Sequence, residues 1–274
     1  MPEGPEVKIT TDFLKSYAGK QFHTMSILSG RYSKKGDVPG LEEVSLPAKI
    51  ADVNCKGKFI YFTLSYKVNE TCEKYFYLFN TLGMTGMWTD KKTKHSRFCF
   101  FFDDESALYF NDIRSFGTLK FVHSKKELDR KLNSLGPDVL ASEVSLQEFV
   151  DRFIKKPNKT IAECLMNQSV VSGVGNYLKA EILYCSHISP NRLIKDISSL
   201  EWVSLHSNTV AQIRKSYKLG GATIATYRQP NGDEGLYNRR FAVYNESFDP
   251  LGNEVIKETT ADKRTTHWVP AIQK

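Results

Sequence analysis

The first six residues carry groups that can form a covalent bond to a substrate. Once Met1 is removed, which is usual when proline follows, Pro2 becomes the N-terminus and its nitrogen is a free secondary amine. An α-amino group has a pKa of roughly 7.7–8.0, so a neutral, nucleophilic fraction exists near neutral pH. Such an amine attacks a carbonyl carbon, for example C1′ of an opened sugar, and forms an electron-withdrawing iminium. The same segment also fits an ordinary helix start, with Pro5 in the first turn and Glu6 beside it.

Two further segments contain groups suited to hold phosphate. Lys56-Gly57-Lys58 leads into a strongly apolar run, where a lysine can contact a phosphate or simply keep a strand end soluble. Gly173 and Gly175 lie just ahead of a predicted helix. Closely spaced glycines let backbone N–H groups approach a phosphate at a helix N-terminus, although the same spacing occurs in ordinary turns.

Three residues in two predicted turns could fill a gap in a stack of bases. Met84 lies within residues 80–87, and Arg114 and Phe116 lie within residues 111–117. A protein that extrudes a nucleotide needs apolar wedges and a cation for the orphaned base. Both segments are equally compatible with plain loop and core. Near the C-terminus, Lys263-Arg264 gives a predicted hairpin a basic tip that suits a minor groove.

The chain is predicted to be soluble and to favour a polyanionic partner. Its 274 residues allow one large or two modest domains, and its apolar fraction of 41% is enough for a core. A net charge of +7 favours nucleic acid, although a solvated surface would also account for it. No secretory signal and no apolar run near ~20 residues is present. We therefore expect an intracellular monomer, placed in the nucleus, a viral factory or a virion if its source is eukaryotic or viral.

No metal or other cofactor is expected. The five cysteines include no C-x-x-C pair, and the six histidines include no pair at the spacing of ligands on a helix. An odd number of scattered cysteines also argues against a disulfide framework.

The N-terminal half is predicted to be a β-sandwich that begins with a helix. Residues 5–18 form an amphipathic helix, with Ile9 and Phe13 on its apolar side and Thr11 on its polar side, and Gly19 ends it. Residues 31–43, rich in Gly, Lys and Asp, are expected to form a loop. Aromatic and β-branched runs separated by turns predict antiparallel strands at 59–64, 75–79, 97–102, 107–110 and 117–122.

The C-terminal half is predicted to be helical and to end in hairpins. Four pairs have the capping-box spacing that begins a helix: Ser124 with Glu127, Ser145 with Glu148, Thr160 with Glu163, and Ser198 with Glu201. We expect helices at 161–168, 176–186 and 199–218, a polar loop at 227–240 and short strands from 241 to 268. Gly136-Pro137 marks the boundary, which gives domains at 1–135, 136–240 and 241–274.

Taken in their order along the chain, these segments resemble the Fpg/Nei family of DNA glycosylases. The matching blocks span nearly the whole chain and comprise residues 2–7, 56–58, 82–86, 112–117, 135–138 and 173–177. The resemblance implies an α+β fold of two domains. The first would be an antiparallel β-sandwich with an N-terminal helix, and the second a helix–two-turn–helix domain with a β-hairpin finger.

The resemblance also implies roles for single residues. Pro2 would be the Schiff-base nucleophile, Glu3 the general acid/base, and Glu6 a support of the sugar site. The residues that would bind DNA are Lys58, Gly173, Gly175, Asn176 and Arg264 at phosphates, and Met84, Arg114 and Phe116 in the void left by a flipped nucleotide.

Two features resemble the Nei branch of the family rather than the Fpg branch. Gly4 stands where the Fpg branch usually has leucine. No cysteine follows Cys185, so the four-cysteine zinc finger of most bacterial members cannot form. The C-terminus instead resembles the zincless finger of vertebrate and giant-virus Nei-like members. Ser115 also departs from the bacterial pattern, which often has a second arginine there.

These features predict a bifunctional DNA glycosylase and abasic-site lyase of base excision repair. We expect it to act on double-stranded DNA with oxidised bases or abasic sites, with single-stranded DNA as a further candidate. It would remove oxidised pyrimidines and cut the strand by β,δ-elimination. One alternative is an oxidised-purine glycosylase that acts on 8-oxoguanine or formamidopyrimidines, and another is a non-catalytic module that binds damaged DNA. The choice of lesion is expected to lie in residues 227–240.

Overall fold

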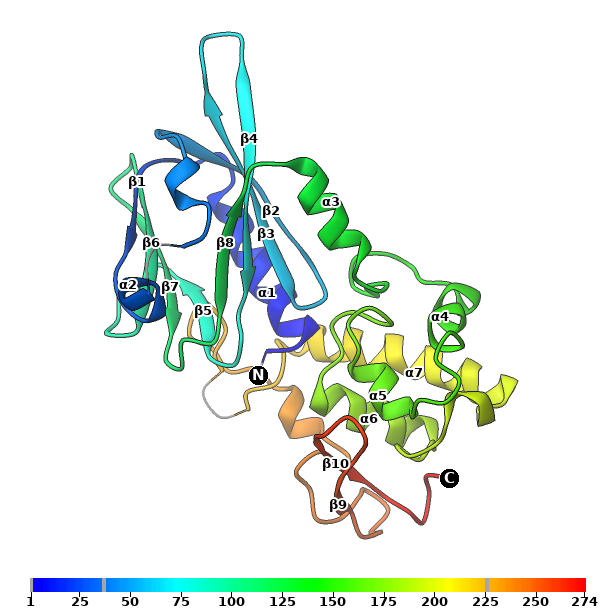
Figure 1. Ribbon diagram of the computed structural model, residues 1–274. Coiled ribbons are helices and arrows are strands. Elements are labelled where there is room, and N and C mark those ends of the chain that lie inside the picture. The colour runs from blue at the N-terminus through cyan, green and yellow to red at the C-terminus, as the bar shows by residue number, and fades with distance from the viewer. Residues whose placement is uncertain (1, 36–37, 225–226) are drawn as a thin grey trace. The chain divides into compact units, whose positions relative to one another are not determined.

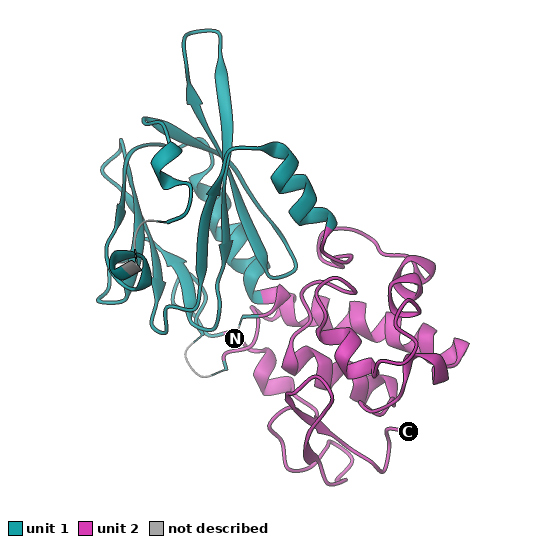
Figure 2. Ribbon diagram, in the orientation of Figure 1, with its two compact units in different colours: residues 1–2, 6–133, 224–234 teal, residues 3–5, 134–223, 235–274 magenta. Residues whose placement is uncertain are grey.

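The chain forms two compact units. The computed structural model describes residues 2–35, 38–224 and 227–274 (Figure 1). Residues 1–2, 6–133 and 224–234 form unit 1, and residues 3–5, 134–223 and 235–274 form unit 2 (Figure 2). The separation of 136–240 from 241–274 as two domains stays a prediction.

Unit 1 is an antiparallel β-sandwich preceded by a helix, as the sequence predicted. The helix α1 (Gly4–Leu14) continues into a 3-10 turn, η1 (Lys15–Tyr17), and the chain turns at Gly19, whose φ is 90°. A further helix, α3 (Lys125–Asn133), ends the main segment of the unit. The strands between them are β1 (Gln21–Ile27), β2 (Ala48–Lys56), β3 (Phe59–Lys67), β4 (Glu73–Thr81), β5 (Gly86–Thr89), β6 (Ser96–Phe102), β7 (Ala107–Asp112) and β8 (Thr118–Val122).

The eight strands form two facing sheets, which are joined where β1 pairs with β2. Their hydrogen-bonded order is β5-β7-β6-β1-β2-β3-β4-β8, and the pairs are antiparallel. Strands β1 and β2 share two paired positions, whereas β3 and β4 share eight. Phe62 of β3 packs against Trp88 of β5 and Phe100 of β6, with ring centroids 5.2 and 6.0 Å apart. Aromatic side chains therefore join the two sheets across the core.

The buried face of α1 differs from the prediction at Thr11. Val7 and Leu14 are buried in the core, and Thr10 and Thr11 are buried as well. Thr10 Oγ1 donates to the Glu6 carbonyl (2.9 Å) and Thr11 Oγ1 to the Val7 carbonyl (2.8 Å). The prediction that Thr11 faces solvent is wrong, because a hydroxyl that bonds to the preceding turn can be buried without an unsatisfied donor.

The predicted loop at 31–43 contains two helical turns, α2 (Arg31–Lys35) and η2 (Leu41–Glu43), and its residues 36–37 lie outside the described chain. Tyr32 holds the first of them. Its hydroxyl accepts the N–H of Leu119 (2.7 Å), and the Arg31 guanidinium lies 4.7 Å from the centre of its ring. The partner on β8 is 87 residues away along the chain, so local composition could not reveal this anchor.

The helices of unit 2 begin at the positions that were predicted from their capping residues. Thr160 with Glu163, and Ser198 with Glu201, form complete capping boxes that satisfy N–H groups in the first turn. The helices are α4 (Leu146–Phe153), α5 (Ile161–Met166), α6 (Asn176–Ser186) and α7 (Ser199–Lys218), with a 3-10 turn η3 (Ile194–Asp196) before α7. The segment from α5 to α6 is the helix–two-turn–helix. No helix of the described chain is long and apolar enough to cross a membrane.

The end of unit 2 is a short hairpin of β9 (Ile256–Thr259) and β10 (Thr265–Trp268), which pairs four positions beside α6 (Figure 1). Before it, a 3-10 turn η4 (Tyr237–Arg240) replaces the last part of the predicted polar loop. The Tyr237 ring is fully buried and its hydroxyl donates to Gln212 Oε1 (2.6 Å), which ties this turn to α7. The predicted two-domain α+β fold is confirmed.

Replacing Phe100 with alanine is expected to lower the free energy of unfolding by about 3–5 kcal/mol, because the buried ring leaves a cavity. Its centroid lies within 6.3 Å of five other aromatic rings. Urea denaturation followed by circular dichroism measures the change. Phe116→Ala, at a side chain that is 51% exposed, is the control and should cost less than about 1 kcal/mol. An unchanged unfolding midpoint for Phe100→Ala would contradict its place in the core.

Candidate active site

Glu3 is held at the N-terminus of α6. Its carboxylate accepts three backbone N–H bonds, from Gly175 to Oε2 (2.7 Å), from Tyr177 to Oε1 (3.0 Å) and from Leu178 to Oε2 (3.3 Å). The residue is 3% exposed. A helix N-terminus offers unpaired N–H groups and a partial positive charge, so it holds the carboxylate in one orientation.

The glycines ahead of α6 make room for Glu3. A Cβ at Gly175 would lie 2.2 Å from Glu3 Cδ, and a Cβ at Gly4 would lie 2.9 Å from Gly173 Cα. The Gly4 N–H donates to the Gly173 carbonyl (2.8 Å). The predicted role of this turn, presenting N–H groups to a phosphate, stays a prediction, and two of these N–H groups bond within the chain. The Gly175 N–H is taken by Glu3, and the Gly173 N–H donates to Gln168 Oε1 (3.0 Å).

Asn176 and Arg264, predicted as phosphate contacts, lie close together where α6 meets the hairpin. Asn176 Nδ2 donates to the carbonyl of Thr265, the neighbour of Arg264 (2.9 Å). The Arg264 side chain is exposed, and its backbone N–H donates to Asp262 Oδ1 (3.3 Å). A helix and a hairpin about 90 residues apart along the chain are thus joined by a side-chain bond next to Arg264.

The three predicted void-filling residues also lie together, in unit 1. Arg114 Nη1 donates to Met84 Sδ (3.2 Å), and the Arg114 guanidinium lies 4.7 Å from the centre of the Phe116 ring. All three side chains are exposed. An apolar side chain, a cation and an aromatic ring are therefore presented as one exposed group.

Asp112 and Thr85 hold the two turns that carry this group. Thr85 Oγ1 donates to Asp112 Oδ1 (2.5 Å) and accepts the Arg114 N–H (2.9 Å). Asp112 Oδ2 accepts the Gly117 N–H (2.7 Å). Ser115, where the bacterial pattern often has arginine, adopts a left-handed φ of 55° between them. The hydrogen bonds fix the turn, so Arg114 and Phe116 project on the same side as Met84.

Pro2 lines a pocket of about 160 Å³ in unit 1, together with Met84. The pocket is also lined by Met87 and by two residues that the sequence did not single out, Tyr227 and Arg228. No local motif marked them, because residues 227–240 read only as a polar loop. A pocket of this size is well below the range for drug-sized ligands and suits a single ring system.

The Tyr227 hydroxyl is a buried polar group that could bond to a ligand. Burial, and then the charge of Glu6, raise the pKa of the Tyr227 phenol, so it stays protonated at neutral pH. Within the described chain this hydroxyl has no hydrogen-bond partner. A buried hydroxyl that is left unpaired costs free energy, so a ligand that bonds to it gains affinity. Glu6 itself is fully buried in α1.

Lys58 lies in the two-residue turn between β2 and β3. Gly57 precedes it with a φ of 57°, which glycine adopts readily in a tight hairpin. Lys56, the other lysine of this segment, contacts α3, where its Nζ donates to the Leu132 carbonyl (3.0 Å). Of the two lysines, Lys58 is therefore the one at the hairpin tip.

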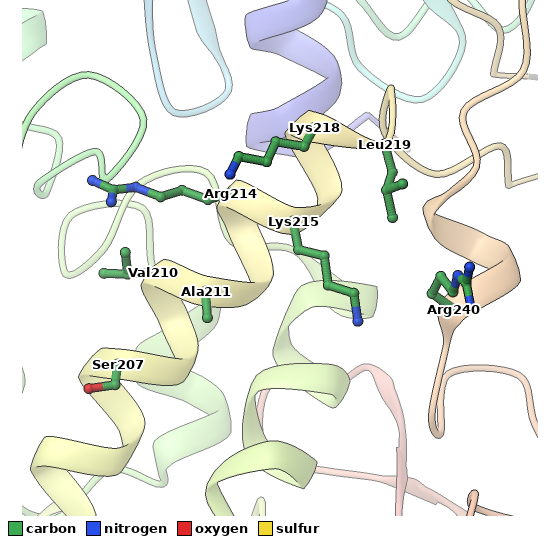
Figure 3. Close-up of a pocket in the computed structure, with 8 residues that line it drawn as sticks. All are labelled: Ser207, Val210, Ala211, Arg214, Lys215, Lys218, Leu219 and Arg240. Atoms are coloured by element: carbon green, nitrogen blue, oxygen red, sulfur yellow. The ribbon is translucent and has the colours of Figure 1, made fainter.

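A larger hollow, of about 720 Å³, lies on α7 and η4 of unit 2. Its cations are Arg214, Lys215, Lys218 and Arg240, and Figure 3 shows Lys215 and Arg240 on either side of one gap. None of the predicted site residues lines it. Size therefore does not mark the chemical site, since Pro2 lines the smaller pocket.

The described residues contain no group of three or more His, Cys, Asp or Glu side chains placed to hold a metal ion. Burial raises the pKa of the Cys99, Cys164 and Cys185 thiols to about 11, which keeps them protonated and unreactive.

Comparison with known proteins identifies the family. Models of the formamidopyrimidine-DNA glycosylase N-terminal, H2TH and C-terminal domains match residues 1–119, 135–228 and 237–274. A formamidopyrimidine-DNA glycosylase of Oceanobacillus iheyensis is 30% identical over 284 positions, covering 100% of this chain and 98% of that protein. The chain belongs to the formamidopyrimidine-DNA glycosylase (Fpg/Nei) family. It is a DNA glycosylase of base excision repair, and the predicted enzyme class, with its abasic-site lyase activity, is confirmed.

Solved structures of this family agree with the fold. The MutM (Fpg) protein of Thermus thermophilus superimposes with a TM-score of 0.84 at 28% identity, over 99% of this chain and 98% of that one. Lactococcus lactis Fpg, in a complex with DNA that contains an abasic site, superimposes with the same TM-score at 24% identity, over 99% of each chain. These relatives are bacterial and carry the Fpg name, so the predicted Nei-like branch and zincless finger stay predictions.

Replacing Gly175 with alanine is expected to displace the Glu3 carboxylate, because the new methyl group would overlap it. If Glu3 is the acid/base, release of a damaged base in single-turnover assays should fall by about 100-fold, as for loss of a general acid. Leu200→Ala, at a side chain of unit 2 that is 83% exposed, is the control. Normal base release by Gly175→Ala would show that the position of Glu3 does not matter.

Proposed function

We propose that this glycosylase uses Pro2 as its nucleophile and Glu3 as its acid/base. One observation carries the proposal. Pro2 lines a pocket suited to one ring system, and the next residue along the chain is a carboxylate fixed by three N–H bonds. Neighbouring Cα atoms are about 3.8 Å apart, so both groups can reach the same sugar.

The exposed groups of both units support extrusion of the damaged nucleotide. Met84, Arg114 and Phe116 would enter the space that the flipped nucleotide leaves, with the wedge, cation and ring already in contact. Lys58, Asn176 and Arg264 would bind phosphates beside it. The substrate would be double-stranded DNA bound by a monomer, in the compartment that holds the genome, which is the nucleus or a viral factory for a eukaryotic or viral source.

The chemistry needs only groups of the chain itself. Glu3 assists opening of the deoxyribose ring while the Pro2 nitrogen attacks C1′, and the damaged base leaves with its bonding electrons and a proton. The resulting iminium acidifies the C2′ protons, because their electrons can move onto the charged nitrogen. β-Elimination and then δ-elimination expel the phosphates on the two sides. Glu6, buried in α1, supports the segment at the sugar.

We further propose that the chain belongs to the Nei-like branch and prefers oxidised pyrimidines. Gly4 supports the branch, because even a Cβ there would crowd Gly173, and the leucine usual in the Fpg branch would not fit without a shift. The β9–β10 hairpin, in a chain with no cysteine after Cys185, supports a finger that forms without zinc. The relatives named for formamidopyrimidine favour the alternative, an oxidised-purine preference.

Borohydride trapping tests the nucleophile. Borohydride reduces an iminium to a stable amine, so the wild-type chain without Met1 should form a covalent adduct with DNA that contains an abasic site. A variant that retains Met1, in which the Pro2 nitrogen is a tertiary amide, should bind this DNA and form no adduct. Pro2→Gly should weaken trapping strongly, and Glu3→Gln should suppress base release. Undiminished trapping in the blocked variant would exclude Pro2, and an untrapped wild type would support a binding module.

Tyr227→Phe tests the choice of lesion. Loss of the hydroxyl should reduce release of the preferred base by about tenfold and change the order of preference, because one hydrogen bond in the pocket is removed. The substrates are matched duplexes with thymine glycol, 5-hydroxyuracil, a hydantoin or 8-oxoguanine. Tyr75→Phe, at an exposed strand position, is the control. Preferential release of 8-oxoguanine by the wild type would favour the oxidised-purine alternative.

A further inference from the structure

Unit 2 contains an ion pair that is almost completely withdrawn from solvent. Lys179 Nζ on α6 lies 2.5 Å from Asp262 Oδ2, in the turn between β9 and β10. The side chains are 0% and 4% exposed. The other ion pairs of the described chain have a side chain that is at least 25% exposed.

Stability alone does not account for this pair. Removing two charges from water is costly, and replacing such a pair by apolar side chains is often neutral or stabilising. The cost shows at Lys179, where burial lowers the pKa of the amine against the opposing effects of Asp262 and Glu3. What a satisfied buried pair does supply is a single geometry, because any displacement leaves a charge unpaired.

Asp262 sets the conformation of the turn that carries Arg264. While Oδ2 binds Lys179, Oδ1 accepts the Thr260 hydroxyl (2.6 Å) and the backbone N–H of Arg264 (3.3 Å). Lys263, between them, has a left-handed φ of 61°, which a non-glycine residue keeps only when its surroundings hold it. One carboxylate therefore connects Lys179 of α6 to the backbone of Arg264.

The same helix holds Glu3. The carboxylate of Glu3 is bound at Gly175, Tyr177 and Leu178, and Lys179 is the next residue of α6. A two-stranded hairpin alone is marginally stable, and β9–β10 pairs only four positions. The position of its tip relative to Glu3 must therefore come from contacts with α6.

We propose that the Lys179–Asp262 ion pair positions Arg264 relative to Glu3, so that a DNA phosphate bound by Arg264 places the damaged sugar at the acid/base. Lys179 and Asp262 are positioning residues, and neither contacts the substrate. The inference rests on the proposed function, in which Arg264 binds DNA. The buried ion pair would fix the hairpin tip. No cysteine follows Cys185 in this chain, so no cysteine can help to hold the tip.

The test compares Asp262→Asn with Arg264→Ala and with the double variant. Affinity is measured by fluorescence anisotropy on a duplex with a stable abasic-site analogue, and chemistry by borohydride trapping at saturating DNA. Each single variant should bind about tenfold more weakly, as expected for loss of one charge-assisted hydrogen bond. Trapping at saturating DNA should also be slower in both, because the sugar is no longer placed at Glu3. The double variant should bind no more weakly than Arg264→Ala. Losses that multiply, or unchanged affinity in Asp262→Asn, would overturn the proposal.

Three further variants separate positioning from folding. Lys179→Met with Asp262→Leu removes both charges and keeps an apolar pair, so it should melt near the wild-type temperature yet bind weakly. Wild-type affinity in this variant would overturn the proposal even if Asp262→Asn fails to fold. Lys179→Arg should keep most of the affinity, since charge and reach remain. Asp129→Asn, which breaks an exposed pair with Lys125, should change nothing. An untrapped wild type would refute the proposed function, a result distinct from all of these.

Discussion

The contact between Glu3 and the start of α6 is the interaction on which the candidate site depends. Three N–H groups of unit 2 bind one carboxylate that lies a single residue after Pro2. Residues 3–5 belong to unit 2, whereas Pro2 and residues 6–14 of α1 belong to unit 1. Gly4 and Gly175 follow from the same contact, since a Cβ at Gly4 would crowd the Gly173 backbone and a Cβ at Gly175 would overlap the carboxylate.

A second constraint is that α6 is buried on almost all sides while carrying charged residues. Lys179 is satisfied by Asp262, and the Glu181 carboxylate accepts the N–H groups of residues 242–244 at 2.8–3.0 Å. Each charge therefore binds a different segment of the C-terminal tail. A buried charge must be paired. Lys179 and Glu181 would destabilise α6 if unpaired, and by binding the tail they hold it against the helix.

Local signals predicted most elements, and long-range contacts account for the errors. The capping boxes at Thr160 and Ser198 begin helices where expected, because a cap acts within four residues. The segment 31–43, predicted to be a loop, contains a helical turn that Tyr32 holds through its bond to Leu119, which is remote in the chain. Thr11 was predicted to face solvent because its side chain is polar. Its hydroxyl instead bonds to the Val7 carbonyl, which allows it to be buried.

The sequence by itself determined the family and the enzyme class, because several short motifs occur together along one chain. It also predicted most residues of the proposed site, but not Tyr227. Only the tertiary structure decided how those residues are used. It directs the N–H of Gly175 to Glu3, places Tyr227 beside Pro2 in a pocket, and ties Arg264 to α6 through Asp262. These are contacts between segments far apart along the chain, and their geometry depends on packing and burial that no local pattern of residues encodes.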